Sequence, residues 1–366
     1  INSLVLPDDV TKKRIENGDD FVIRFKTPKD ESLILHDEVR GVINIDTNIL
    51  DDKVLFKSDG MPTYHLANIV DDYLMKISHV IRGEEWLPSL PLHVLLYNSF
   101  GWPVPKFAHL PLILKPVGKG KLSKRDGDKL GFPVFPLAYT NEKTGEVSRG
   151  YKEDGYFPDA FINMLSLLGW NPGTDQELFT LNNLISSFEL SRVSKSGAKF
   201  NLDKTNWFNQ QYLQNKTNDE LSKLYEIILK EKGLNSSYDY INKVISLIKE
   251  RAVFIKDFWG LSSYFFETPS SYNEKASKKQ WKENTGELMK EAVSLISSID
   301  DFSSSAIEEV IKNWISLKEI GFGKIMQPLR LAIVGDMKGP HLFDIIEMIG
   351  KKETIIRIHK IINTLS

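Results

Sequence analysis

The spacing of apolar and polar residues divides the chain into two parts. Residues 21–50 alternate apolar and polar side chains, as in "FVIRF" and "GVINID", which is typical of short antiparallel strands. Residues 63–75 place apolar side chains at helical spacing, and residues 91–100 form a second such segment that ends at Gly101. After about residue 201 nearly every segment has the helical pattern. The first part is therefore predicted to be α/β and the second all-α.

Two apolar, β-rich segments flank the helix predicted at 91–100. They are "ISHVI" at 77–81 and "FAHLPLIL" at 107–114. Strand, helix and strand in this order form a βαβ unit, in which the strands run parallel and the crossover is right-handed. Open parallel sheets bind ligands at the carboxyl ends of their strands. The residues that follow these two strands are therefore expected to share one candidate binding edge.

The remaining helices are predicted from the same periodicity. A helix at 157–170 has proline near its start and glycine near its end. The later helices are predicted at 218–233, 240–259, 283–299, 304–321, 324–335 and from 342 to the end. The polar segment 267–280 is interpreted as a link between two helical subdomains.

Composition limits the classes of protein that the chain could represent. Its 366 residues, 41% hydrophobic and 26% charged, are typical of a globular protein with two or three domains. The net charge is −2, so a nucleic-acid partner would need a local basic patch. The absence of cysteine excludes disulfides, thiolate zinc sites and a cysteine nucleophile in this chain, and agrees with a reducing cytosol. No apolar run reaches the roughly 18 residues that a membrane span needs.

The sequence after the second predicted strand is rich in glycine and basic residues. It reads "GKGKLSKRDGDKLGF" over 118–132. Such segments are usually solvated turns, but at a ligand-binding edge this one is also a candidate phosphate clamp, with Lys121, Lys124 and Arg125 reaching the ligand. It lacks the spacing of a P-loop, and no helix is expected to start at Ser123.

Residues around the first predicted strand form a second candidate site. Arg82 could hold a substrate carboxylate through two hydrogen bonds, or form a salt bridge with one of the two glutamates that follow it. Tyr64 and Asn68 share one face of a helix, where they could orient a small zwitterion or satisfy polar groups at a sheet edge. Trp86 could form a pocket wall or belong to the core. Four histidines without the spacing of metal ligands are interpreted as structural: His65, His79, His93 and His109.

These residues resemble a known family. The stretch "SDGMPTYHLANIVDDYLMKISHVIRGEEWLPSLPLHVLLYNSFGW", followed by "FAHLPLIL" and "KLSKR", closely resembles the second half of the catalytic domain of bacterial glutamyl-tRNA synthetases. KLSKR at 121–125 is similar to their version of the class I signature KMSKS. The resemblance continues through "GYFPDAFINMLSLLGWNPG" and "KFNLDKTNWFNQQYL" to "GKIMQPLRLAIVGDMKGPHLFDIIEMIGKKE", and so covers essentially the whole chain.

The resemblance implies a ligase that activates glutamate with ATP and Mg²⁺ and transfers the glutamyl group to the terminal adenosine of tRNA-Glu. It implies catalytic roles for Lys124 and Lys121, and an anticodon contact for Arg330. The implied ATP-binding residues are Lys121, Leu122, Ser123, Lys124 and Arg125. The implied glutamate-binding residues are Tyr64, Asn68, Arg82 and Trp86. No zinc or other protein-bound metal is expected, and a cytoplasmic monomer that does not bind membranes is expected.

The implied architecture has four parts. Residues 1–53 would be the remainder of a connective insertion that binds the tRNA acceptor end. Residues 54–118 would be the second half of a Rossmann-type catalytic domain. Residues 119–200 would contain the KLSKR loop and a region that contacts the tRNA stem. Residues 201–366 would be a helical anticodon-binding domain, with two subdomains divided near 267–280.

The chain also departs from the family. The His-x-Gly-His-like motif of the first strand–helix turn is absent, so we expect the first half of the nucleotide fold to be missing. The stretch "GFPVFPLAYTNEKTGEVSRGYKED" intervenes between KLSKR and "GYFPDAF", and Asp126 stands where family members commonly carry His. Two alternatives stay open: a tRNA-binding fragment without catalysis, and an enzyme that also charges tRNA-Gln. Glutaminyl-tRNA synthetase itself is disfavoured because its anticodon region resembles β-barrels, whereas this one is predicted to be helical.

Overall fold

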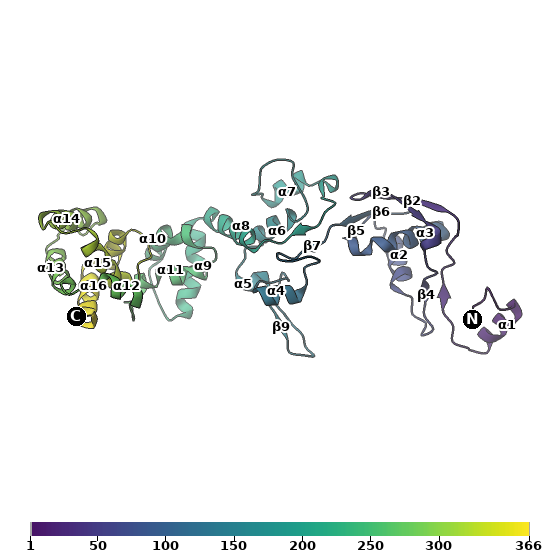
Figure 1. Ribbon diagram of the computed structural model, residues 1–366, viewed down its shortest axis with the longest axis horizontal. Helices are drawn as coiled ribbons and strands as arrows, with labels where there is room; N and C mark the ends of the chain where they lie inside the picture. The colour runs from purple at the N-terminus through teal and green to yellow at the C-terminus, as the bar shows by residue number, and fades with distance from the viewer. Residues whose placement is uncertain (1, 366) are drawn as a thin grey trace. The chain divides into compact units, whose positions relative to one another are not determined.

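The computed structural model describes residues 2–365 and divides into two compact units, whose elements are labelled in Figure 1. The first unit runs to Val134 and also contains Ile162–Leu202, and the second contains Phe135–Phe161 and the residues from Asp203 onward. The division at 161/162 lies inside helix α6 (Pro158–Ser166). The four-part domain division drawn from the sequence stays a prediction.

The first unit is a mixed α/β structure. Its strands are β1 (Ile23–Arg24), β2 (Ser32–Asp37), β3 (Gly41–Asp46), β4 (Val54–Phe56), β5 (His79–Gly83), β6 (Lys106–Leu110), β7 (Ile113–Leu114) and β10 (Ala198–Lys199). Its helices are α1 (Asp8–Glu16), α2 (Tyr64–Leu74), α3 (Leu90–Phe100), α4 (Lys124–Leu130) and α7 (Leu181–Ser187), with short 3-10 turns η1 (Thr47–Ile49), η2 (Glu84–Ser89) and η3 (Leu190–Arg192).

A four-stranded sheet, in the order β3-β2-β6-β5, organises this unit. Strands β2 and β3 pair antiparallel, as the alternating pattern predicted, and β5 and β6 pair parallel on either side of α3. The predicted βαβ unit is therefore confirmed. Helix α3 ends at Gly101, whose φ of 67° is left-handed and favours glycine. Ile69 of α2, Leu96 of α3 and Phe107 of β6 belong to one buried cluster, so both helices pack on the sheet.

The second unit is almost entirely helical. It contains α5 (Tyr151–Asp154), α8 (Leu202–Asn215), α9 (Asn218–Glu231), α10 (Tyr238–Ile248), η4 (Lys249–Arg251), α11 (Asp257–Phe266), α12 (Glu274–Gln280), α13 (Thr285–Ser297), α14 (Ser304–Leu317), α15 (Gly323–Val334) and α16 (Leu342–Leu365). One large apolar core joins α9 to α16. The stretch that intervenes after KLSKR forms part of this unit, where β8 (Tyr139–Thr140) and β9 (Val147–Ser148) pair as an antiparallel hairpin.

Three predicted elements differ from the structure. The helix predicted at 240–259 is two helices, α10 and α11, and between them the Asp257 carboxylate accepts the N–H groups of Val253 and Phe254, at 3.0 and 2.8 Å. The strand predicted at 107–114 is interrupted, and its second piece, β7, pairs with β10 instead of β5. The polar segment 267–280, predicted as a link, contains α12.

Candidate active site

Arg82 lies on β5 opposite His109 of β6, at the edge of the sheet that the sequence predicted. Its Nε donates a hydrogen bond to His109 Nε2 at 3.1 Å, and its Nη2 approaches the Trp86 carbonyl oxygen at 3.5 Å. The salt bridges considered as an alternative are not those of the structure, since Glu84 pairs with Arg40 and Glu85 with Lys121.

One nitrogen of Arg82 is left without a partner. Nη1 is buried and has no hydrogen-bond partner among residues 2–365. A charged N–H group that is removed from water without an acceptor costs several times more than an ordinary hydrogen bond contributes. Nη1 is therefore suited to receive an acceptor from a ligand.

The other predicted glutamate-binding residues lie around Arg82. The Tyr64 and Trp86 rings have centroids 4.6 Å apart, and the Arg82 guanidinium carbon lies 6.0 Å from the Trp86 ring. Trp86 is 38% exposed, which excludes the core role considered for it. Asn68 lies one turn after Tyr64 on α2, and within the described residues its buried Oδ1 accepts no hydrogen bond. Arg82 thus lies beside the Tyr64 and Trp86 rings and has an unused donor, and α2, which carries Tyr64, also carries an unused acceptor on Asn68.

Two of the histidines interpreted as structural lie behind this site. His65 Nδ1 and His93 Nε2 share a hydrogen bond of 3.1 Å. Burial lowers the pKa of His93 to about 3 and also lowers the pKa of His65. Both side chains are therefore neutral at physiological pH, and they add no charge to the site.

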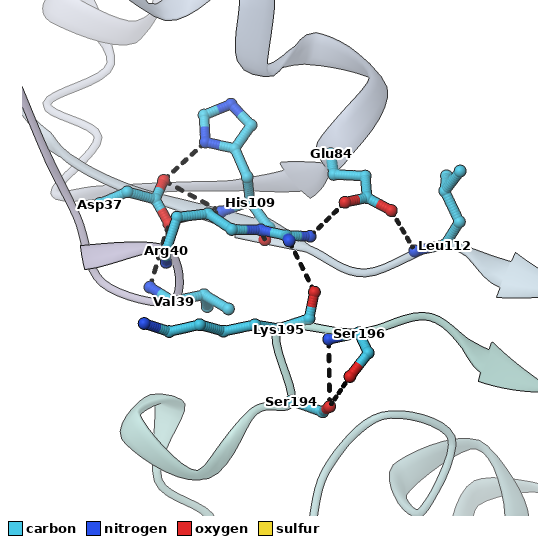
Figure 2. A network of polar contacts seen from close by, with 9 residues as sticks. All are labelled: Asp37, Val39, Arg40, Glu84, His109, Leu112, Ser194, Lys195 and Ser196. Carbon is cyan, nitrogen blue, oxygen red and sulfur yellow. Dashed lines mark hydrogen bonds and ion pairs between the residues drawn. The ribbon is translucent and has the colours of Figure 1, made fainter. Parts of the chain in front are cut away.

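A buried polar network that the sequence did not predict supports the same edge (Figure 2). Asp37 Oδ2 accepts a hydrogen bond from His109 Nδ1 at 2.6 Å, and both side chains are 0% exposed. The Arg40 guanidinium donates to the His109 and Lys195 carbonyl oxygens, at 3.2 and 2.6 Å, and pairs with Glu84. The only signal in the sequence is the cluster of charged residues "DEVR" at the end of a strand.

The KLSKR segment contains the start of a helix, so the expectation that no helix begins at Ser123 is wrong. The Asp126 carboxylate accepts hydrogen bonds from the Ser123 backbone N–H at 2.9 Å and from Ser123 Oγ at 2.5 Å, which completes a capping box for α4. These bonds, with the ion pair to Lys115, lower the pKa of Asp126 to about 2. The Ser-x-x-Asp spacing could have revealed this helix.

Backbone contacts join the segment to β7, which pairs with β10 in a separate two-stranded sheet. The Leu122 N–H donates to the Ile113 carbonyl at 2.8 Å. The ammonium group of Lys121 pairs with Glu85, and the two side chains are 58% and 39% exposed. The segment therefore starts beside η2, the 3-10 turn that carries Trp86.

Arg330 lies in α15 of the second unit. Its Nη1 is buried and unpaired within residues 2–365, and burial lowers the pKa of Arg330. A cavity of about 900 Å³ in this unit is lined by Arg251, Tyr264, Lys338 and Gly339, among others. A Cβ placed on Gly339 would lie 3.4 Å from Arg330 Nη1, so the arginine lies close to Gly339, one of the residues that line this cavity.

No group of three or more His, Asp or Glu side chains within residues 2–365 is placed to hold a metal ion. No helix of that range is long and apolar enough to cross a membrane.

Comparison with known proteins identifies the family. The family described as "tRNA synthetases class I (E and Q), catalytic domain" matches residues 2–207, and the family "Anticodon binding domain" matches residues 212–362. The glutamate–tRNA ligase of Flavobacterium johnsoniae is 61% identical over 363 residues, which are 99% of this chain and 72% of that protein. The corresponding protein of Christiangramia forsetii is 57% identical over 364 residues, 100% of this chain and 72% of that protein.

A solved structure gives the same result. The glutamate tRNA ligase of Elizabethkingia meningosepticum, described as in complex with its amino acid, matches with a TM-score of 0.95 and 53% identity. The match covers 100% of this chain and 72% of that one. The predicted fold class, a class I catalytic α/β region followed by a helical anticodon-binding region, is confirmed. The chain belongs to the glutamate–tRNA ligase family of the class I tRNA synthetases.

Proposed function

We propose that the site around Arg82 binds the glutamate that this ligase attaches to tRNA-Glu. The observation that carries the proposal is the buried Nη1 of Arg82, which has no acceptor within the described chain. A substrate carboxylate supplies that acceptor, and the planar guanidinium suits its two oxygens. The buried Oδ1 of Asn68 is a matching acceptor for the ammonium group of an amino acid.

The aromatic residues complete this site. The Tyr64 and Trp86 rings, 4.6 Å apart, offer an apolar surface to the methylene groups of glutamate. Donor, acceptor and apolar wall match one carboxylate, the ammonium group and the methylene groups of the substrate. Arg82 would hold the carboxylate and Asn68 the ammonium group, with the rings against the methylene groups.

The KLSKR segment is proposed to bind ATP, which class I synthetases use. When the glutamate carboxylate attacks the α-phosphorus, negative charge builds on the departing pyrophosphate, and a positioned ammonium group lowers that barrier. Lys124 is assigned this role, with Lys121 and Arg125 in support, and Leu122 and Ser123 placing them. Mg²⁺ would share the phosphate charge.

Lys121 has to leave Glu85 in order to reach a phosphate. Their ion pair is largely exposed, and such pairs contribute about 0–1 kcal/mol. A phosphate carries more negative charge than one carboxylate, so the replacement of Glu85 by a phosphate as the partner of Lys121 is favourable. Glu85 then holds Lys121 near the site while no nucleotide is bound.

The helical second unit is proposed to contact the anticodon, with Arg330 as the residue that meets a base or a phosphate. Its unpaired Nη1 beside a cavity of about 900 Å³ supports this role. A synthetase that serves protein synthesis would act in the cytoplasm, and we expect it to work as a monomer.

Substitution of Arg82 tests the glutamate assignment. We expect Arg82→Lys to raise the KM for glutamate by about tenfold, the scale of one hydrogen bond to a charged group, because an ammonium cannot reproduce the planar geometry. The KM for ATP should change little. ATP–pyrophosphate exchange with tRNA-Glu present measures both constants. Arg14→Lys, at an exposed pair with Asp19, is the matched control. Glutamate kinetics near those of the unaltered enzyme in Arg82→Lys would contradict the assignment.

A further inference from the structure

We propose that Asp37 and His109 are positioning residues for glutamate binding, because they hold the guanidinium of Arg82 in the orientation in which Nη1 has no acceptor within the described chain and can take one from the substrate. The inference rests on the proposed role of Arg82 and extends it to two residues that do not touch the substrate. Side-chain hydrogen bonds join Asp37 of β2 to His109 of β6, and His109 to Arg82 of β5.

The first link is a buried carboxylate with all its hydrogen bonds satisfied. Asp37 Oδ2 accepts from His109 Nδ1 at 2.6 Å, and Oδ1 accepts from the backbone N–H groups of Val39 and Arg40, at 3.0 and 2.8 Å (Figure 2). The backbone N–H of His109 also donates to both carboxylate oxygens of Asp37, with distances of 3.3 Å to Oδ1 and 3.2 Å to Oδ2. A carboxylate held from so many directions cannot rotate, so it fixes the ring of His109.

The second link follows from the donors and acceptors. Arg82 Nε can only donate a hydrogen bond, since a guanidinium has no acceptor atom. His109 Nε2, 3.1 Å away, must therefore accept and carry no proton. The proton of the neutral ring is then on Nδ1, where Asp37 accepts it. A single protonation state satisfies both bonds, namely ionised Asp37 and neutral His109.

The charge states of both groups agree with this assignment. Burial raises the pKa of Asp37, but the hydrogen bonds from His109 and the backbone outweigh that effect and bring the pKa below its usual value. Burial lowers the pKa of His109, although the nearby carboxylate acts in the opposite direction. Asp37 is therefore ionised and His109 neutral near pH 7.

The third link fixes the plane of the guanidinium. Nε is held by His109, and the guanidinium carbon lies 5.7 Å from the Phe107 ring and 6.0 Å from the Trp86 ring. A free arginine side chain loses conformational freedom when it binds a ligand, and that loss weakens binding. Because Arg82 is already ordered, this loss is reduced. The effect belongs to substrate affinity and not to the chemical step.

The backbone of His109 is braced as well. Arg40 donates to the His109 carbonyl at 3.2 Å and pairs with Glu84, whose Oε1 accepts the N–H of Leu112 at 3.1 Å (Figure 2). The His109 carbonyl and the N–H of Leu112 are thus tied to the turn after β5 through Arg40 and Glu84.

Two substitutions of His109 separate positioning from simple packing. In His109→Asn the amide nitrogen can take the place of Nδ1 and still donate to Asp37, but no atom replaces Nε2. In His109→Gln the carbonyl oxygen can reach the Nε2 position and accept from Arg82. We expect His109→Asn to raise the KM for glutamate by about tenfold, as for the loss of one hydrogen bond to a charged group. The KM for ATP should stay within about twofold, and His109→Gln should stay closer to the unaltered enzyme.

The assay is ATP–pyrophosphate exchange with tRNA-Glu, performed on the full natural chain. His79→Asn, at an exposed position at the start of β5, is the control. Arg82→Lys is measured in parallel. Unchanged glutamate kinetics in Arg82→Lys would refute the proposed glutamate site itself. A raised KM in Arg82→Lys with an unchanged KM in His109→Asn would refute only the positioning role. Equal increases for glutamate and ATP, with no recovery in His109→Gln, would also refute it.

Nitrogen NMR of the histidine rings tests the proposal on the unaltered enzyme, with His109→Gln or His109→Asn used only to assign the His109 signal. The proposal requires His109 to be neutral with its proton on Nδ1 at pH 7. A ring protonated on Nε2, alone or together with Nδ1, would overturn the proposal.

Discussion

The Arg82 site and the KLSKR segment lie in the same unit but are held in different ways. Arg82 is oriented by Asp37 and His109, whose side chains are 0% exposed and fully hydrogen-bonded to each other and to the backbone. Lys121 is held by Glu85 in an ion pair that is largely open to solvent. If the proposed roles hold, glutamate is bound by a preordered arginine, whereas phosphate is bound by a lysine that exchanges one anionic partner for another.

The difference in burial also predicts how much a substitution in each region lowers the stability of the protein. Removing one member of a buried charged network leaves its partners unsatisfied, which typically costs about 3–5 kcal/mol. Breaking an exposed ion pair costs about 0–1 kcal/mol. Stability should therefore depend strongly on the first region and weakly on the second.

The largest effect is expected for Asp37→Ala. It leaves His109 Nδ1 and the N–H groups of Val39 and Arg40 without an acceptor in the interior. The free energy of unfolding of the first unit should fall by about 3 kcal/mol or more. Hydrogen exchange of the β2 and β6 amides measures this unit separately. A loss below about 1 kcal/mol, the scale of the exposed Asp59→Ala control, would remove the distinction between the regions.

Lys124→Ala tests the phosphate-binding region. We expect the rate of glutamyl-adenylate formation to fall by at least about 100-fold, the scale of losing one preorganised group that stabilises the transition state. The KM for glutamate should change little, since Arg82 is untouched. Lys129→Ala, in the last turn of the same helix, is the control. Normal adenylate formation in Lys124→Ala would exclude it from catalysis.

The buried histidines behind Arg82 predict how stability depends on pH. Burial lowers the pKa of His93 to about 3, whereas in the unfolded chain it is about 6.5. The unfolded chain therefore takes up the proton first, and the stability of the first unit should decrease as the pH falls from about 6.5 towards 3. At pH 5 the loss should be about 2 kcal/mol, and His65 and His109 act in the same direction.

Denaturation of His93→Gln between pH 7 and 5 checks this dependence. The slope of unfolding free energy against pH should be smaller than in the unaltered chain by up to about 1.4 kcal/mol per pH unit. Equal slopes would show that folding does not lower the pKa of His93.

The smallest effect is expected for Glu85→Gln. The substitution removes the carboxylate that pairs with Lys121, so the phosphates of ATP no longer compete with Glu85 for the ammonium group of Lys121. The KM for ATP should fall about twofold, with stability changed by less than about 1 kcal/mol. A large rise in the KM for ATP would instead mean that Glu85 places Lys121 for catalysis.

The sequence predicted the elements that periodicity determines. The βαβ unit placed Arg82 at the correct edge, and helical spacing put Tyr64 and Asn68 on one face of α2. The Asp37–His109 pair could not be predicted in this way, because its members are 72 residues apart and meet only through the β2–β6 pairing. Helix α4 was missed because its glycine suggested a loop. Gly127 is buried, and a Cβ there would lie 2.8 Å from the Phe132 carbonyl oxygen.

One experiment tests the division of roles most directly: ATP–pyrophosphate exchange by Arg82→Lys and Lys124→Ala, measured side by side over a range of glutamate and ATP concentrations. We expect Arg82→Lys to raise the KM for glutamate by about tenfold and to leave that for ATP nearly unchanged. We expect Lys124→Ala to lower the maximal rate by at least about 100-fold at an unchanged KM for glutamate. Two variants that alter the same constants to the same extent would contradict this division of roles.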